Sequence, residues 1–340
     1  MGADLPAFWA GRLQDLPGDD MMEKTSEEGN AVRHILIDTD TGSDDAVAIV
    51  MALHCPGVRV EAITAVAGNV PLEQAGRNAR IAVEWAGLAR PPVHLGCGGP
   101  MLRELTYAYE THGRDGMGDI GIPDPQMPLA AGHGADVIIE LARRFAGELE
   151  IVALGPLTNL ALALLREPRV AGWVKQLTVM GSAGFGPGNV TPTAEFNIWA
   201  DPEACAVVLR AGIPQLYAGW DLCCGEAVLT EGEIEEVLAE GSPCAQLCIR
   251  CNRCLMELNT RRFGSPCLDM ADPVAMAVAL WPELVKESLP CFSYVNTGEG
   301  LDRGQLVFDW TGAAGRPANA AVVRAVHIPT MKRRLLEAIA

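Results

Sequence analysis

Short runs of apolar residues alternate with longer amphipathic segments from residue 34 onwards. The apolar runs predict β-strands at 34–38, 58–67, 93–96, 149–155 and 174–181. Segments in which apolar residues recur every three or four positions predict helices at 44–54, 71–87, 135–146 and 156–166. Strands that alternate with helices of this length are typical of βαβ units, so we predict an α/β fold with a mostly parallel central sheet flanked by helices.

The last third of the chain follows a different pattern. Helical patterns cover 231–258 and 272–280, and strand-like segments at 291–295, 305–310 and 321–328 precede a final helix. There is no internal repeat and no long linker, so we predict one domain over residues 31–340. Residues 1–30 are rich in Gly, Pro, Asp and Glu with little periodicity, and they predict a flexible tail.

The charge and the cysteine content narrow the class of protein. There are 43 acidic and 26 basic side chains, a formal net charge of −17, and such a surface repels phosphate backbones and anionic lipid. We therefore expect neither a nucleic-acid nor a membrane partner. The 11 cysteines favour reduced thiols. With no signal-peptide pattern at the N-terminus, they predict a cytoplasmic protein.

Four carboxylates follow the first predicted strand within eight residues: Asp38, Asp40, Asp44 and Asp45. Ligand sites of open α/β sheets lie at the carboxyl ends of the strands. Carboxylates this close repel one another unless a cation compensates them or some are protonated, so the cluster indicates a metal site. In the alternative interpretation Asp44 caps the next helix and the others are solvated, which accounts for one or two of the four.

A strand that ends in Asp-x-Asp is also the first motif of haloacid-dehalogenase-type phosphatases, in which the first Asp is the nucleophile. That chemistry also needs a later Lys followed by an acidic pair. No convincing acidic pair follows Lys175, so this alternative is the weaker one.

The acidic segment 38–46 (DTDTGSDDA) and several later segments resemble the inosine-uridine type nucleoside hydrolases. The later segments, in order, are 64–69 (TAVAGN), 112–118 (HGRDGMG), 154–159 (LGPLTN), 179–181 (VMG), 188–189 (GN), 194–197 (AEFN), 201–203 (DPE) and 272–273 (DP). The resemblance spans about 34–335 and implies the nucleoside hydrolase fold, with a Rossmann-type core. It also implies hydrolysis of the N-glycosidic bond of ribonucleosides to ribose and free base, for purine or pyrimidine salvage, by a homodimer or homotetramer.

The same resemblance implies roles for individual residues. A Ca²⁺ ion would be held by Asp40, Asp45, Asp272 and the main-chain oxygen of Leu154, which suits a cation that takes 6–8 oxygen ligands. Asp40 would also be the general base for a Ca²⁺-bound water. The other implied site residues are Asp44 and Asn69 at the ribose and the water, Asn189, Glu195 and Asn197 at the sugar, His112 near the base, and Asp38 as a support of the loop. Without the resemblance, Asn189, Glu195 and Asn197 would be interpreted as turn residues and His112 as an ordinary loop histidine.

The chain departs from the family pattern on the side of the base. Many members that accept pyrimidines carry a His, the general acid for the departing base, immediately before the last metal-binding Asp; here that position is Ala271. Trp199 and Trp220 could stack on the base, although buried structural tryptophans are the simpler interpretation. The absence of this acid keeps a second hypothesis open, a nucleoside- or ribose-binding protein with little turnover.

Four cysteines lie where many relatives carry tyrosines: Cys244, Cys248, Cys251 and Cys254. The first three match the spacing of an iron–sulfur cluster motif. On a helix, however, steps of four and three place side chains along one face rather than around a cluster. We therefore predict a helix face packed on the core or at the substrate mouth rather than a metal site.

Overall fold

The computed structural model describes residues 32–340, so the predicted tail at 1–30 lies outside the described residues. One nine-stranded sheet runs through this part of the chain, in the order β3-β2-β1-β4-β5-β6-β9-β7-β8. Neighbouring strands from β3 to β9 are parallel, and β7 and β8 are antiparallel additions at one edge. The strands are β1 (Arg33–Thr39), β2 (Val58–Ala65), β3 (Val93–Leu95), β4 (Leu149–Ala153), β5 (Gln176–Met180), β6 (Gln215–Ala218), β7 (Val285–Val295), β8 (Leu306–Asp309) and β9 (Ala320–Val326).

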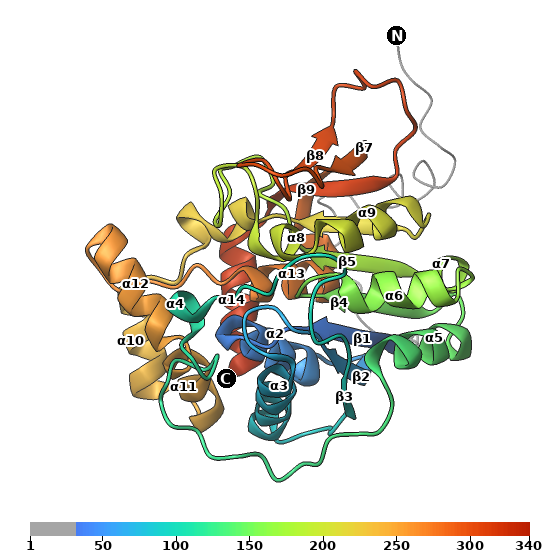
Figure 1. Ribbon diagram of the computed structural model, residues 1–340. Coiled ribbons are helices and arrows are strands. Elements are labelled where there is room, and N and C mark those ends of the chain that lie inside the picture. Colours follow the sequence, from blue (N-terminus) through green and yellow to red (C-terminus); the bar gives the residue numbers. More distant parts are fainter. Residues whose placement is uncertain (1–31) are drawn as a thin grey trace, which may run out of the picture.

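Helices cover both faces of this sheet (Figure 1). The α-helices are α2 (Ser43–His54), α3 (Leu72–Ala86), α4 (Tyr109–His112), α5 (Gly134–Arg144), α6 (Thr158–Arg166), α7 (Val170–Trp173), α8 (Phe196–Ala200), α9 (Pro202–Arg210), α10 (Glu231–Glu240), α11 (Pro243–Arg250), α12 (Arg253–Phe263), α13 (Ala271–Leu280) and α14 (Ile328–Ile339). Three 3₁₀ turns are η1 (Trp220–Cys223), η2 (Gly225–Ala227) and η3 (Pro282–Leu284). The predicted α/β fold with a mostly parallel sheet is confirmed.

The side chains of β1 alternate between the two faces of the sheet, as expected for a central strand. Ile35 and Ile37 belong to the core that contains α2, α3, α13 and α14, whereas Leu36 belongs to the core under α5, α6 and α9. Because both faces of β1 are covered, its sequence is a continuous apolar run. Its parallel pairing with β2 on one side and β4 on the other places it in the middle of the sheet.

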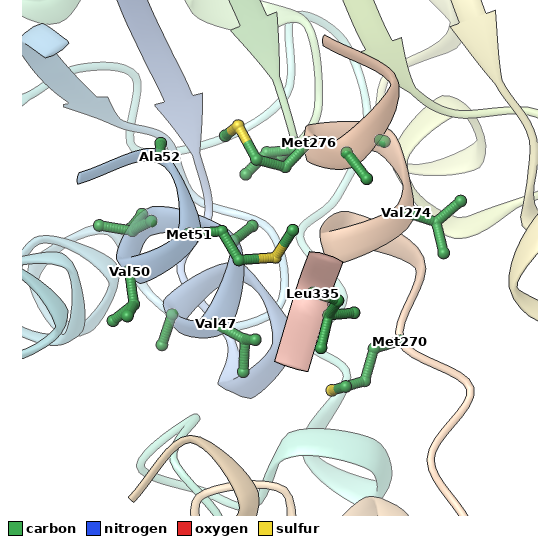
Figure 2. Close-up of a cluster of buried hydrophobic side chains, with 14 of the residues drawn as sticks. Val47, Val50, Met51, Ala52, Met270, Val274, Met276 and Leu335 are labelled. Atoms are coloured by element: carbon green, nitrogen blue, oxygen red, sulfur yellow. The ribbon is translucent and has the colours of Figure 1, made fainter. Parts of the chain in front are cut away.

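Helices α2 and α13 are buried almost all round. Residues 43–52 of α2 and the whole of α13 are buried. Figure 2 shows Val47 and Met51 of α2 close to Met276 of α13 and Leu335 of α14. A helix that is apolar on all sides belongs in the interior, so both helices form a rigid base for the residues at their N-termini.

The sequence patterns miss several elements of the last two thirds. Strand β6 and helix α9 were not predicted, and β7 begins at Val285 rather than at 291. The helical pattern over 231–258 is divided into α10, α11 and α12, with Pro243 as the first residue of α11. Proline lacks an N–H donor and is tolerated in the first turn of a helix but not in its interior, so a new helix begins there.

Candidate functional site

Strands β1 and β4 lie side by side, but the chain leaves them in opposite directions across the sheet. After β1 it continues to β2 and β3 on one side, and from β4 it continues to β5 and β6 on the other. The loops diverge there and leave a crevice at the carboxyl ends of the strands, which is where open α/β sheets bind ligands. Asp38 is the last residue but one of β1 and Leu154 follows β4, and the two are joined by a hydrogen bond of 2.7 Å from Leu154 N to Asp38 O.

The acidic loop after β1 is held by main-chain donors. Asp45 Oδ2 accepts from Gly42 N at 2.8 Å, and Asp40 Oδ2 accepts from Asn69 N at 2.6 Å. Asp45, rather than Asp44, therefore supplies the capping carboxylate of α2. A Cβ atom on Gly68 would lie 2.1 Å from Asp40 Oδ2, so only glycine allows the main chain to approach this carboxylate so closely.

Helix α13 places one more carboxylate, that of Asp272, next to the acidic loop. One oxygen from each of Asp44, Asp45 and Asp272 lies within 4.8 Å of the others. Burial raises the pKa of Asp40, Asp45 and Asp272, and repulsion among the four carboxylates raises it further. Oδ1 of Asp40 and Oδ1 of Asp44 are buried and accept no hydrogen bond from the described residues.

This donor set fits a divalent cation. Its atoms are all oxygens, two of them are buried without a protein donor, and their combined charge is high, which is what a hard cation requires. The close triad contains Asp44, which we assigned to the ribose. Asp40 is not part of the triad, but it is near enough for the charges of Asp45 and Asp44 to raise its pKa. The acidic site brought together by the fold can hold a metal ion.

Asp38 lies within β1, outside this cluster, and does not line the cavity. Its Oδ1 accepts from the Thr64 hydroxyl and, at 2.8 Å, from Asn159 Nδ2, while its Oδ2 is buried without a donor. Burial raises the pKa of Asp38 to about 7. Because Asn159 also accepts from Cys97 N at 2.7 Å, Asp38 is tied to the loop after β3.

Amides and a carboxylate form the opposite wall. Glu195 caps α8 and accepts from Asn197 N at 2.9 Å and from Ser182 N at 3.3 Å. Burial raises the pKa of Glu195 to about 7. Asn197 Nδ2 donates to Leu154 O at 2.6 Å, and Asn189 Oδ1 accepts from Phe196 N at 2.9 Å.

A cavity of about 270 Å³ connects these walls. Of the residues assigned from the sequence, Asp44, Asn69, His112, Leu154, Asn189, Glu195, Asn197 and Asp272 line it. Asp40 and Asp45 are fully buried behind them. Sequence reasoning missed Thr106, Tyr107, Ala108, Glu110, Thr111, Met180, Val190, Phe196, Leu255, Leu258, Arg262 and Asp269, which also line it. The helical spacing of Leu255 and Leu258 carried a signal, because residues three apart share a face, and Met180 and Phe196 lie within segments that resemble the family.

His112 and Trp220 line the cavity, whereas Trp199 does not. His112 Nδ1 lies 2.9 Å from the Ser43 hydroxyl and 3.7 Å from Asp44 Oδ1, and the ring lines the cavity. Trp220 lines it too, whereas Trp199 packs under the guanidinium of Arg303, 3.9 Å from the ring centroid. Ala271 forms part of the wall next to Asp272 and has no proton to donate.

Three of the four cysteines, Cys244, Cys248 and Cys251, pack in or against the core as the helical spacing predicts, whereas Cys254 is half-buried on α12. Cys248 and Cys251 are buried, and Cys244 packs partly buried against the same cluster. Cys251 Sγ donates to Cys248 O at 3.3 Å. These sulfurs therefore form part of the packing between α11 and its neighbours.

The match to a family model supports the resemblance found in the sequence. The model described as inosine-uridine preferring nucleoside hydrolase matches residues 35–333. The chain belongs to this family. Membership makes the protein an enzyme of the class that hydrolyses N-glycosidic bonds.

Individual members of the nucleoside hydrolase family agree with this assignment. The non-specific ribonucleoside hydrolase RihC of Salmonella enteritidis is 36% identical over 310 residues, which cover 90% of this chain and 97% of RihC. A plant nucleoside hydrolase structure superposes with a TM-score of 0.85 at 29% identity, over 91% of this chain and 99% of its own. The purine-preferring ribonucleoside hydrolase from Gardnerella vaginalis gives 0.83 at 28% identity, over 90% and 98%.

Family membership argues against the phosphatase alternative, and so do the lysines. Lys175 binds Glu150 at 2.8 Å, and Lys332 binds Glu233 at 2.7 Å. No lysine of residues 32–340 lines the cavity. Within the same residues, no helix has the length and apolarity needed to cross a membrane.

Proposed function

We propose that this enzyme hydrolyses the N-glycosidic bond of ribonucleosides to ribose and free base, with Ca²⁺ as its cofactor. The observation that carries the proposal is the Asp40 carboxylate. It is fully buried, its Oδ1 has no donor among the described residues, and it lies at the point where β1 and β4 diverge. A carboxylate oxygen left open in this position is suited to accept a proton from a water molecule.

Asp40, Asp45, Asp272 and the main-chain oxygen of Leu154 would hold the cation. Asp44 lies within the same group of oxygens and can share in its binding. Bound there, Ca²⁺ would lower the pKa of a coordinated water and attract the ribose hydroxyls. Leu154 O already accepts from Asn197 Nδ2, and a carbonyl oxygen has a second lone pair for the cation.

The protein side chains supply the other requirements of the reaction. Asp40 takes the proton of the attacking water, while Asp44 and Asn69 contact the ribose hydroxyls and that water. Glu195, Asn189 and Asn197 bind the sugar from the opposite wall. Cleavage of the glycosidic bond gives the ribose oxocarbenium character, and the negative carboxylates around it stabilise that charge.

The base would lie among His112, Tyr107 and Trp220, which line the same cavity. Aromatic rings offer large apolar faces that suit a planar base. Ala271 cannot protonate the departing base, and this one residue favours the second hypothesis, a nucleoside-binding protein with little turnover. The buried Asp40 argues against a mere binder, because binding alone does not need a group placed to activate water.

Release of reducing sugar from inosine, uridine and adenosine tests the proposal. We expect ribose to be released with Ca²⁺, release to stop in a chelator, and added Ca²⁺ to restore it. Asp40→Asn should reduce kcat by about 10²–10⁴, the usual contribution of a general base. A nucleoside complex without base release would favour the binding protein, and full activity of Asp40→Asn would overturn the assignment of Asp40.

The cytoplasmic location, the role in salvage and the homodimer or homotetramer stay predictions. Sedimentation of the purified full chain tests the assembly, and a monomer at micromolar concentration would contradict it.

A further inference from the structure

The base end of the cavity has a largely apolar wall that contains one buried carboxylate. Leu255 and Leu258 of α12, together with Ala271, line this wall and are buried. Asp269 lies among them, lines the cavity and is only 8% exposed. Apolar sites orient their ligands through a few fixed polar groups, and a carboxylate in this position can be such a group.

Asp269 is held in place by α12. Asn259 Nδ2 donates to Asp269 Oδ1 at 2.7 Å and to Cys267 O at 3.1 Å. Leu268 and Leu229 exchange two main-chain hydrogen bonds, of 2.9 and 3.1 Å, which fix the segment before α13. No other side chain of residues 32–340 donates to the Asp269 carboxylate, so it keeps acceptor capacity for a ligand in the cavity.

Opposing influences act on the Asp269 carboxyl group. Its pKa is raised, mainly by burial and also by the nearby Asp44 carboxylate, while the Asn259 amide and the positive charge of Arg262 act in the opposite direction. Arg262 also lines the cavity and is exposed. An ionised carboxylate only accepts hydrogen bonds, so Asp269 would favour a ligand that presents a donor.

We propose that Asp269 accepts a hydrogen bond from the edge of the base opposite the glycosidic bond. It would thereby select nucleosides that present an N–H group at that edge. This inference rests on the proposed nucleoside hydrolysis and adds to it a group that discriminates among bases. A base with a lone pair at that edge would face the lone pairs of the carboxylate and leave it unpaired in a buried wall. Such a mismatch reduces kcat/KM by about tenfold to a hundredfold.

Two pairs of nucleosides remove the N–H group without adding bulk, and in both pairs the neighbouring carbonyl oxygen is removed with it. Purine riboside replaces the N1–H of inosine with a ring nitrogen lone pair, and pyrimidin-2-one riboside does the same for the N3–H of uridine. The ratio of kcat/KM within a pair, measured with purified full chain and Ca²⁺, is compared between variants. The intrinsic lability of each glycosidic bond cancels in that comparison.

Asp269→Asn turns the acceptor into a donor without changing its size. The Asn259 amide would still pair with the side-chain oxygen, so an NH₂ group would face the base. We expect the preference for inosine over purine riboside, or for uridine over its analogue, to fall at least tenfold. Asn259→Ala, which releases Asp269, should lower the same ratio with little change in kcat for the analogue. Glu257→Gln, the same change on the outer face of α12 where Glu257 pairs with Arg253, should leave the ratio unchanged.

The wild-type protein gives a measurement that does not depend on the variants folding. 1-Methylinosine and 3-methyluridine lack the N–H and should be poor substrates and poor competitive inhibitors. An unchanged ratio in Asp269→Asn, or equal use of methylated and parent nucleosides, would overturn this inference alone. Failure to hydrolyse any parent nucleoside would overturn the proposed function and this inference with it.

Discussion

The side-chain amide of Asn197 donates to the main-chain oxygen of Leu154 over 2.6 Å and joins the start of α8 to the loop after β4. Leu154 O is one of the proposed cation ligands, so Asn197 orients it. We expect Asn197→Ala to weaken Ca²⁺ binding by about 10–100-fold, the usual effect of removing a group that orients a metal ligand. Calorimetric titration of the metal-free protein with Ca²⁺ measures this.

Asn189→Ala is the matched control for that experiment. Asn189 is also assigned to the sugar, but its Oδ1 accepts from Phe196 N and it does not contact Leu154. It should raise KM for the nucleoside and leave the affinity for Ca²⁺ unchanged. Equal losses of Ca²⁺ affinity in both variants would contradict the role assigned to Asn197.

The close approach of Gly68 to Asp40 predicts the effect of a single methyl group. A Cβ atom there would lie 2.1 Å from Asp40 Oδ2, so Gly68→Ala must displace the carboxylate. We expect kcat to fall about as far as in Asp40→Asn, by 10²–10⁴. The folded state should persist, as judged by circular dichroism. Gly172→Ala on α7, where a Cβ meets nothing within 4 Å, should keep full activity; a similar loss there would point to a general effect of the substitution.

Asp38 makes the metal-free protein sensitive to pH. Its folded pKa, about 7, lies above the unfolded value, so its contribution to stability is fully present at acid pH and is lost as the pH rises towards 7. Asp38→Asn should therefore stabilise the metal-free protein at pH 8, by up to about 4 kcal/mol, and have little effect at pH 4. Denaturant unfolding at both values measures the difference. Glu195 titrates in the same direction, so part of the pH slope should remain.

Ca²⁺ should stabilise the folded protein because it relieves the repulsion among Asp40, Asp45 and Asp272. At a free concentration a hundred times its Kd, a ligand adds about 2.7 kcal/mol to the free energy of unfolding. We expect a concentration-dependent rise in Tm in wild type and no such rise in Asp272→Asn. An exposed control, Asp136→Asn, removes only the surface pair with Arg166 and should retain the rise. A rise in Asp272→Asn equal to that of wild type would exclude Asp272 as a ligand.

Most of the acidic side of the site can be located in the sequence because its carboxylates, apart from Asp272, lie in one segment. Asp38 to Asp45 form one segment. Because this segment follows a buried parallel strand, it must lie at the carboxyl edge of the sheet. The base side is different. Asp269 depends on Asn259, ten residues away across a turn, and Tyr107 comes from a long loop with no periodic pattern. Strand β6 is only four residues long, too short for its apolar pattern to stand out.

The two parts of the site should differ in how well they tolerate amino-acid substitutions. The carboxylates and sugar-binding amides are fixed at the strand ends and on the first turns of α2, α8 and α13, where a small shift disturbs several of them at once. In the proposed binding mode the base contacts mainly α4, α12 and the segment before α13, which lie apart from the sheet (Figure 1). Substitutions there can therefore alter which nucleoside is accepted while the bond-breaking apparatus stays intact, so one scaffold can give rise to enzymes with different preferences.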